Sequence, residues 1–598
     1  MKQFVITVAG VLIGLILFAV LTPMALIAFA SAAARPAPLP AASVLVLDLR
    51  TGLTDQPPDM PFAFLQGRGN SVLGIEQTLR RAGRDSAVKG LLVRLPEGGM
   101  APAAADELRR AFLDFRAQGK PILAHSQGLY SDGTVVSTYE LGAASGDLWM
   151  QPGASFQVTG LARDDVFLKR LFDRFGVVAD YQQRYQYKTA VNPFLYDDYT
   201  PAHRESELSW MGSVFETSLV SAANDRRQNP KALMTLIEAG PYSAEEAKAK
   251  GLIDQVGEVK GAEDAILAKA GDGASLVSFN AYAAHARAAR GRGVGQAGAP
   301  VIALIAAEGD IVTGSSAQSG GGPLSGSSAI HSDDVAKAFY DAIDDHDVKA
   351  IVFRVSSPGG SDTASEQILA AVRAAKAAGK PVVVSMGTYA ASGGYWISSQ
   401  ASEIVAEPTT LTGSIGVFGG KFALGKALGR YGVDLRGLKV GGDFADAFSP
   451  DAPMSPSQRA AVSAWMDHIY QGFVARVAEG RHMRPDKVEA IAKGRVWTGA
   501  QAKALGLVDH IGDIYDAVDR AKALAHIQGP ARLRGFNAEA SPLDALRRML
   551  NLEARGVHAA AALGSVLETP AAHATLETLD TANLRAQGST VLAPRLVD

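Results

Sequence analysis

The stretch PVVVSMGTYAASGGYW, residues 381–396, predicts the element around which the chain is organised. Val382–Val384 is a β-branched run typical of a buried strand, which we expect to break at Gly387. The apolar residues after Ser392 have the spacing of a helix face, so this serine is predicted at a strand–turn–helix junction. A serine there is often only a helix cap. A helix N-terminus also offers free N–H groups to a developing oxyanion, as a nucleophilic serine requires.

Length and composition limit the class of protein. At 598 residues the chain is too long for one hydrophobic core, so two or more domains are expected. The 58 Lys and Arg residues nearly balance the 61 Asp and Glu residues without a long charge run, so nothing indicates nucleic-acid binding. The absence of cysteine excludes disulfides, thiolate metal sites and a cysteine nucleophile.

The N-terminal residues are predicted to cross a membrane. Residues 3–34 carry no charge, and the 25 apolar-rich residues Val5–Phe29 would span about 37 Å as a helix, more than the ~30 Å of a bilayer core. Since the apolar part of a cleaved signal peptide has only about 7–15 residues, we expect residues 1–34 to be an uncleaved signal-anchor. Cleavage at Ala30–Ala32 stays open as the alternative. Either way the body lies beyond the membrane.

Three blocks of sequence occur twice in the same order, which indicates a tandem duplication. The pairs are 88–99 with 348–359, 120–124 with 380–384, and 242–254 with 497–509. The repeated unit of about 200 residues is far longer than a solenoid repeat. Short apolar strands alternate with Ala-rich helices, of which 364–378 is one, so each copy is predicted to be α/β.

The duplication also predicts domain boundaries. The expected segments are the anchor at 1–34, a first repeat at 43–283, a linker at 284–300, a second repeat at 301–536 and a tail of unknown role at 537–598. The Gly- and Ser-rich segment 314–328 is expected to be mobile, as a loop or as a flap over a site.

The two copies differ where chemistry is expected. Ser392 falls opposite Asp132 at an offset of 260 and opposite Val136 at an offset of 256, so only the second copy has Ser-Gly-Gly. The second copy also has a turn, Ser357–Gly360, at a strand end. The N–H groups of this turn are candidates to complete an oxyanion hole with Gly393.

A nucleophilic serine needs a base, and the first copy offers Lys188. Its neighbours in the sequence are aromatic and apolar, and burial would lower its pKa toward the range suited to a general base. The competing interpretation is a solvated lysine with its stem on an aromatic surface. The corresponding residues 441–449 contain no lysine. His331 and His346 are alternative bases, although no motif surrounds them.

Five motifs support a resemblance to a known family. They are YKTAVNPF at 187–194, RVSSPGG at 354–360, ASGGYW at 391–396, LTGSIGV at 411–417 and GRVWTG at 494–499. With the anchor and the duplication, the chain resembles the long two-domain form of the signal peptide peptidase A family over roughly residues 1–535. That family consists of membrane-anchored serine proteases of bacterial envelopes.

The resemblance implies a fold and a catalytic mechanism. The fold would be a tandem duplication of a domain related to crotonases and the Clp protease. Ser392 would be the nucleophile and Lys188 the general base, and the N–H groups of Gly393 and of Gly359 or Gly360 would hold the oxyanion. No metal or other cofactor is expected.

The resemblance also implies substrates and surroundings. The substrates would be remnants of signal peptides and other apolar peptides, cleaved by a homotetramer on the periplasmic side of the bacterial inner membrane. Residues 412–417 are expected to pair with the peptide backbone as a free strand edge. The residues predicted to bind substrate there are Thr412, Gly413, Ser414 and Ile415.

Two alternatives belong to other classes. A crotonase-like enzyme would act on an acyl thioester with the same oxyanion hole, but this leaves Lys188 and the anchor unexplained. A catalytically silent envelope scaffold would have no need of both Ser392 and Lys188. Because one fold hosts many functions, the site decides among these alternatives.

Overall fold

The computed structural model describes most of both repeats. The described residues are 38–57, 70–290, 299–316, 329–536 and 591–592. The predicted anchor, most of the Gly- and Ser-rich segment 314–328 and nearly all of the tail lie outside them. Within the described ranges, no helix is long and apolar enough to span a bilayer.

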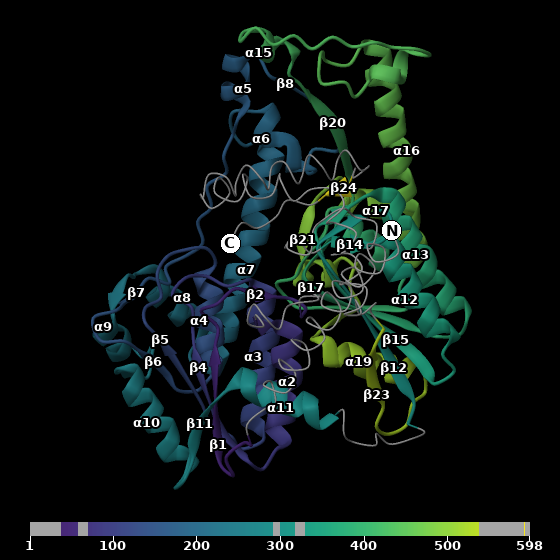
Figure 1. The fold of residues 1–598 in the computed structure, drawn as a ribbon. Coiled ribbons are helices and arrows are strands. Elements are labelled where there is room, and N and C mark those ends of the chain that lie inside the picture. The colour runs from purple at the N-terminus through teal and green to yellow at the C-terminus, as the bar shows by residue number, and fades with distance from the viewer. Residues whose placement is uncertain (1–37, 58–69, 291–298, 317–328, 537–590, 593–598) are drawn as a thin grey trace, which may run out of the picture.

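Two large sheets form the body, one from each half of the chain (Figure 1). The first has the order β10-β6-β5-β4-β1-β11, and all its pairings are parallel. Its strands are β1 (Ser43–Asp48), β4 (Val88–Arg94), β5 (Ile122–Ser126), β6 (Leu148–Met150), β10 (Gln255–Val256) and β11 (Ser275–Ser278). Parallel strands need crossover connections, which supply the covering helices.

The second sheet has the order β21-β19-β17-β15-β12-β23, with β18 and β22 branching from β17. Its strands are β12 (Val301–Glu308), β15 (Val348–Ser357), β17 (Val382–Ala391), β18 (Glu403–Ala406), β19 (Leu411–Gly413), β21 (Val496–Thr498), β22 (His510–Ile511) and β23 (Arg532–Gly535). The α/β architecture predicted for both halves is therefore present.

Helices cover these sheets and connect their strands. Those of the first half are α2 (Val72–Arg84), α3 (Pro102–Ala117), α4 (Val135–Ala144), α5 (Lys169–Phe175), α6 (Asn192–Leu195), α7 (Pro201–Asp225), α8 (Pro230–Glu238), α9 (Ala244–Ala249), α10 (Val259–Ala270) and α11 (Phe279–Arg290). Those of the second half are α12 (Ser332–Asp344), α13 (Asp362–Ala377), α14 (Gly393–Ser398), α15 (Gly425–Gly429), α16 (Pro456–Gly480), α17 (Pro485–Ile491), α18 (Gly499–Ala504) and α19 (Ile514–Leu524). The helix predicted at 364–378 is α13, whereas α11 continues into the predicted linker as far as Arg290.

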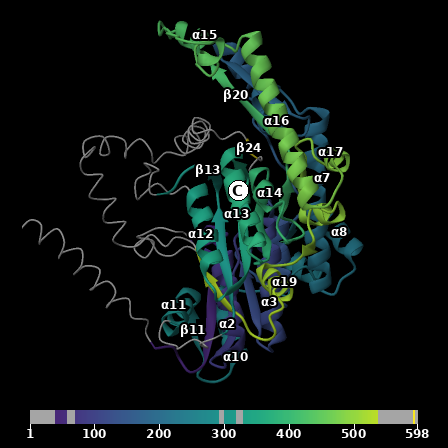
Figure 2. The same cartoon turned by 90° about the vertical axis from the view of Figure 1, so that its right-hand side faces the viewer.

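Small sheets complete the fold. The short strands are β2 (Leu53–Thr54), β3 (Asn70–Ser71), β7 (Ser155–Phe156), β9 (Tyr242–Ser243), β13 (Asp310–Val312), β14 (Ala329–His331), β16 (Gly359–Gly360) and β24 (Val591–Leu592). The longer strands β8 (Val178–Arg184) and β20 (Val417–Ala423) form an antiparallel ladder between the two halves. With α15 and the start of α16, this ladder stands away from the body as an arm (Figures 1 and 2).

Matched hydrogen bonds in the two halves fix the register of the duplication at the serine junction. The buried hydroxyls of Tyr139 and Tyr395 each donate to a leucine carbonyl, at 3.1 and 2.9 Å. Lys120 and Lys380 likewise each donate to carbonyls at the end of a preceding helix. Because the two tyrosines are 256 residues apart, the residue that corresponds to Ser392 is Val136.

Strand β17 does not end at Gly387, so that prediction is wrong. It pairs with β18 over Val383–Met386 and with β19 over Tyr389–Ala391. Gly387 lies between these pairings, where a Cβ atom would come within 2.4 Å of Asp55 Oδ1. The glycine therefore marks a change of neighbouring strand and a close approach by the first half, and the strand carries on to Ser392.

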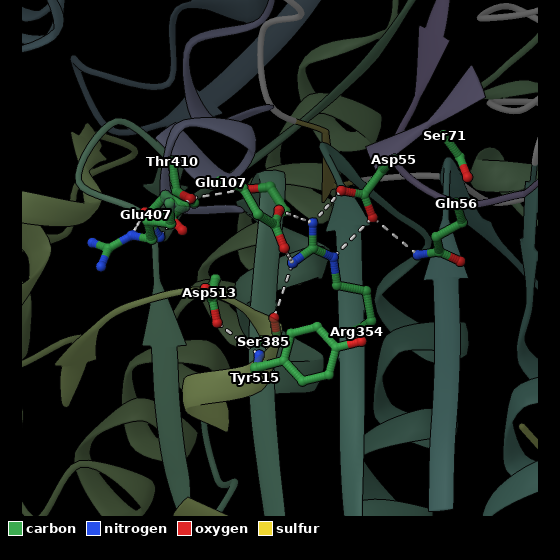
Figure 3. A network of polar contacts seen from close by, with 12 residues as sticks. Asp55, Gln56, Ser71, Glu107, Arg354, Ser385, Glu407, Thr410, Asp513 and Tyr515 are labelled. Carbon is green, nitrogen blue, oxygen red and sulfur yellow. Dashed lines mark hydrogen bonds and ion pairs between the residues drawn. The ribbon is translucent and has the colours of Figure 1, made fainter. Parts of the chain in front are cut away.

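A buried ion-pair network joins the two halves (Figure 3). Arg354 on β15 is buried and donates to both carboxylate oxygens of Asp55, at 2.5 and 3.0 Å. It also donates to both oxygens of Glu107 on α3, at 2.6 and 3.0 Å, and to Ser385 Oγ at 2.9 Å. Each buried charge thus has a partner of opposite sign, without which burial would be very unfavourable.

More carboxylates surround this network than guanidinium groups neutralise. Glu308 accepts the backbone N–H groups of Asp55 and Gln56, while burial and the charge of Asp55 raise the pKa of Glu308 to about 7. Burial also raises the pKa of Glu76 and Glu407 well above the ordinary range. Burial therefore favours the protonated form of these carboxyl groups, and this reduces the negative charge around Arg354.

The network predicts a large loss of stability for Arg354→Met. Two buried carboxylates, Asp55 and Glu107, would lose their counter-charge, so the free energy of unfolding should fall by about 3–5 kcal/mol in chemical denaturation. The control is Arg373→Met, which removes a half-exposed pair with Glu366 and should cost about 0–1 kcal/mol. Equal losses in the two variants would contradict a special role for the buried network.

Candidate active site

Ser392 stands between the last residue of β17 and the first residue of α14. Its backbone has φ 58° and ψ −118°, outside the regions that residues with a side chain prefer, so the local chain is strained. Its N–H donates to the carbonyl of Gly413 at 2.8 Å, and its side chain makes no capping bond. The helix-cap interpretation is therefore wrong, and the hydroxyl is available for another role.

Lys188 from the first half meets Ser392 from the second half. The Nζ atom lies 2.8 Å from Ser392 Oγ and 3.0 Å from both the carbonyl oxygen and Oγ of Ser414. The lysine is completely buried, so the interpretation as a solvated side chain is wrong. Strand β8 ends four residues before Lys188, and its ladder with β20 delivers the lysine to the second half.

A loop of the second half closes over the lysine. The N–H groups of Tyr185 and Tyr187 donate to the carbonyl of Lys493. A Cβ atom at Gly494 would lie 2.4 Å from the backbone nitrogen of Lys188. Gly494 is the first residue of the GRVWTG motif at 494–499. That its lack of a side chain allows this close contact with Lys188 could not be predicted from the sequence.

The surroundings favour the neutral form of Lys188. Burial lowers its pKa well below the ordinary value of 10.5, and among the described residues no opposite charge counters this effect. A neutral amine has one lone pair and two N–H donors. The lone pair can accept the Ser392 hydroxyl proton while the two N–H groups donate to Ser414, which accounts for all three short contacts.

Ser414 holds the lysine in place. Its φ of 49° is unusual for a serine, and its N–H donates to the carbonyl of Arg495 at 2.7 Å. This backbone aims both Ser414 oxygens at Nζ of Lys188. The sequence pointed to Ser414 as a residue that binds substrate, whereas the structure places it beside the predicted base.

The three glycines predicted for the oxyanion hole lie together. A Cβ atom on Gly393 would be 3.0 Å from the nitrogen of Gly360 and 3.1 Å from Cα of Gly359, so a side chain at this position would crowd the turn. As the first residue of α14, Gly393 has an N–H without an intrahelical partner. The N–H of Gly359 donates to Ser357 Oγ at 3.1 Å. Gly393 and Gly360 are therefore the better candidate donors.

The expected free strand edge at 412–417 is occupied, so that prediction is wrong. Thr412 and Gly413 pair on one side with β17 and on the other with β21. Ser414 donates its N–H to Arg495, and the carbonyl of Ile415 accepts from Gly494. From Val417 onward the chain pairs with β8. Pairing with a segment 80 residues further along the chain was not visible in the local sequence.

Another strand lies nearer to the candidate oxyanion hole. Strand β16 consists of Gly359 and Gly360, and one side of it pairs with β13. On the other side the chain's own residues Val591 and Leu592 form β24, antiparallel to the two glycines. A peptide backbone can therefore lie along β16 as an added strand.

The alternative bases are elsewhere. His331 ends β14 and precedes α12, while His346 is exposed in the loop after that helix. Neither is a hydrogen-bond partner of Ser392 in the described part of the chain, where Oγ contacts Lys188.

The buried lysine predicts a pH-dependent gain in stability for Lys188→Met. Between the lowered pKa and 10.5, the unfolded chain binds a proton at Lys188 that the folded chain does not, so wild-type stability rises with pH. The Tm advantage of Lys188→Met should be largest near neutral pH and shrink toward pH 10.5. The control Ser392→Ala keeps the lysine, so its Tm should rise with pH as steeply as that of the wild type. A constant Tm difference across this range would contradict a lowered pKa.

Comparisons with known proteins identify the family of the chain. The model for peptidase family S49 matches the chain twice, at residues 114–271 and 374–528. Protease 4 of Salmonella typhi is 34% identical, over 77% of this chain and 73% of its own. Protease 4 of Haemophilus influenzae is 30% identical, over 87% and 85%. The chloroplastic serine protease SPPA of Arabidopsis thaliana is 28% identical, over 81% and 69%.

The two matched segments confirm the duplication, and each of them contains one residue of the candidate dyad. The first contains Lys188 and the second contains Ser392. A peptidase family contradicts both the acyl-thioester enzyme and the silent scaffold. The chain belongs to peptidase family S49 and is a serine protease of the long, two-domain form.

Proposed function

We propose that the chain is a membrane-anchored serine endopeptidase that hydrolyses remnants of signal peptides and other apolar peptides, with Ser392 as nucleophile and Lys188 as general base. The observation that carries the dyad is the 2.8 Å contact between Nζ of the buried Lys188 and Oγ of Ser392. Burial lowers the pKa of Lys188 and so favours the neutral amine, which is the form that a base requires.

The proposed reaction uses the groups around Ser392 in turn. Neutral Lys188 takes the hydroxyl proton as Oγ attacks the scissile carbonyl. The N–H groups of Gly393 and Gly360 stabilise the oxyanion. The resulting ammonium of Lys188 gives its proton to the leaving amine, with Ser414 holding Nζ in position. Water, deprotonated by the same lysine, then hydrolyses the acyl-enzyme.

The proposed substrate backbone lies along β16, in the position that β24 takes. An antiparallel strand there runs beside Gly359 and Gly360, and these glycines lie against Gly393 at the serine junction. Strand addition supplies affinity through the backbone, which suits a protease that accepts many sequences. Apolar remnants of signal peptides fit such a site because main-chain pairing does not depend on polar side chains.

The proposed setting is the bacterial inner membrane, with residues 1–34 as a single-pass anchor and the catalytic body on the periplasmic side. The uncharged apolar stretch after Lys2 supports the anchor. A homotetramer is proposed as the working assembly. In that setting the enzyme would degrade peptides left in the membrane after secretion, without a metal or other cofactor.

The dyad predicts the effects of substitution on turnover. In the full chain in detergent micelles, Ser392→Ala and Lys188→Ala should each lower kcat/KM for an apolar fluorogenic peptide by at least ~10²–10⁴-fold. Lys188→Arg should be equally inactive because a guanidinium stays protonated. The control Lys260→Ala changes a well-exposed lysine and should keep wild-type turnover. Wild-type turnover in Lys188→Ala would show that another base acts.

The pH dependence gives an independent check. Since the active form is the neutral amine, kcat/KM should rise as pH increases through the lowered pKa of Lys188 and reach a plateau well below pH 10.5. A single rise with its midpoint at an ordinary lysine pKa would contradict the buried general base.

The position of β24 predicts that deleting residues 591–598 increases activity on long peptides. If these residues compete for the β16 edge, deletion should lower KM for a peptide long enough to pair along it and leave kcat unchanged. A small ester that needs no strand pairing serves as the control substrate and should show no change. An unchanged KM for the long peptide would mean that β24 does not occupy the substrate position.

A further inference from the structure

One segment of the arm lacks backbone pairing within the described part of the chain. Residues 434–440, between α15 and α16, form no helix or strand, and no backbone hydrogen bond between described residues begins or ends in them. Two of its three large apolar side chains face solvent: Leu438 is fully exposed and Val440 is 96% exposed, whereas Leu435 is partly buried. The segment crosses the outer end of the arm (Figure 1). Isolated apolar residues on a surface are common, but a run of them on an unpaired segment indicates an interface.

The duplication identifies the counterpart of this segment. At an offset of 256, residues 160–177 match 416–433 without a gap, and α5 and α15 begin directly after Leu168 and Leu424. Gly176 and Gly432 then share a left-handed φ, at 78° and 76°. The next residues, 178–184 in the first half, are strand β8. Residues 434–440 are therefore the second half's equivalent of β8.

The partner of β8 has an equivalent as well. β8 pairs with β20, residues 417–423, and the same offset leads back to residues 161–167 of the first half. These residues also lie outside every helix and strand, and Val166 among them is 73% exposed. The chain thus contains one complete ladder and the two separate halves of a second one.

We propose that residues 434–440 of one copy of this chain pair antiparallel with residues 161–167 of a second copy, in the register of the β8–β20 ladder. The inference rests on the self-association proposed above and names its interface, without fixing the number of copies. Because the two segments are different surfaces, the contact is heterologous, and repeating it generates a ring when the rotation between copies closes.

The charges fit this register. Within the chain, Asp180 of β8 lies opposite Lys421 of β20. The equivalent pair between copies is Arg436 opposite Asp165, so the two charges are exchanged but still opposite in sign. Within the single chain Arg436 pairs with Asp434 and Asp165 pairs with Arg163, so the contact between copies would add to or replace these ion pairs. The next position brings Leu435 opposite the exposed Val166, an apolar pair. Direct cross-strand pairs of both kinds stabilise a sheet.

The helix behind the ladder fits too. Within the chain, Arg184 of β8 lies against α16, where it donates to Asp467 and Ser463. The equivalent of Arg184 at the offset of 256 is Val440. Helices α7 and α16 begin 255 residues apart, so the equivalent of Ser463 on α7 is Leu208, which is 56% exposed. A polar contact within the chain would thus become an apolar contact between copies, and both exposed side chains would be covered.

A pair of tryptophans extends the interface. Trp210-Met211 on α7 and Trp465-Met466 on α16 correspond at an offset of 255. Trp210 is 4% exposed because it packs against the second half, next to Leu411 and Val496. Trp465 is 40% exposed. In the proposed contact Trp465 is covered by the first half of the next copy, as Trp210 is covered within its own chain.

This junction between copies would not be a second active site. The residues equivalent to Ser392 and Lys188 are Val136 and Phe444. Each copy therefore has one dyad, formed within the chain, and one purely structural junction with its neighbour. A mechanism-based serine reagent would label one site per chain.

The test is a cross-link between two differently tagged full-length chains, co-expressed and purified in detergent. One carries Val166→Cys and the other Leu435→Cys, and the natural sequence has no cysteine. Directly opposite residues in an antiparallel pair have Cβ atoms about 4.5–5.5 Å apart, so oxidation should give a covalent dimer of the two tags. The slipped pair Val166→Cys with Arg436→Cys places the thiols on opposite faces and should not cross-link.

Each outcome is informative. A dimer from the first pair alone supports the register. If the chains co-purify without cross-linking, or cross-link equally in the slipped pair, this interface is wrong. Self-association of the chain would still be supported. Chains that do not co-purify at all overturn both, and peptidase activity measured in the same sample reports on the catalytic proposal separately.

A second variant removes the contact without touching the fold of the single chain. Leu438→Asp with Val440→Asp changes two side chains that are already in solvent, so the thermal unfolding of the chain should be preserved. Light scattering should show a smaller assembly. The control Tyr340→Asp alters an exposed residue on α12 and should keep the wild-type mass. An unchanged mass for the double variant would contradict the proposal.

Discussion

The burial of one lysine amine beside one serine hydroxyl is the constraint on which the rest of the structure depends. Lys188 can be neutral only where water and carboxylates are kept away from it. Neither half of the chain provides such a place alone. The lysine follows a strand of the first half, while the serine junction, Ser414 and the loop at Gly494 belong to the second. The β8–β20 ladder lies at the boundary between the halves, and its pairing places Lys188 of the first half beside Ser392 of the second half.

This arrangement is unfavourable for folding and has to be offset elsewhere. A buried neutral lysine gives up the hydration of its ammonium, and Ser392 and Ser414 both hold backbone angles that serine avoids. The apolar cores of the two sheets supply most of the compensation. Arg354, with Asp55 and Glu107, fixes how the halves meet, since a shifted interface would leave three buried charges unpaired. Correct placement of the lysine therefore depends on a polar network in another part of the interface.

The sequence was sufficient to predict the α/β class, the duplication and the two residues that meet at 2.8 Å. Comparing the two copies revealed the duplication and made Ser392 and Lys188 candidates, and the resemblance to the signal peptide peptidase A family then implied their roles as nucleophile and base. The failures share a cause, which is dependence on distant segments. Gly387 looked like a strand end because its neighbour Asp55 comes from the other half. The edge at 412–417 looked free because β21 and β8, which occupy it, lie far away along the chain. The partners of Arg354 could not be predicted for the same reason.

The exchanged charges would also prevent each strand from pairing with the wrong partner strand. If residues 434–440 competed with β8 for β20, Arg436 would face Lys421, and two cations would lie directly opposite each other. If β8 paired with residues 161–167 of another copy, Asp180 would face Asp165, which is equally unfavourable. Like charges in directly opposed positions destabilise a ladder, so each strand is rejected by the wrong partner as well as accepted by the right one. This matters for chemistry because only β8 leads to Lys188. A wrong pairing at β20 would bring Phe444 to Ser392 in place of the lysine, and that site would have no base.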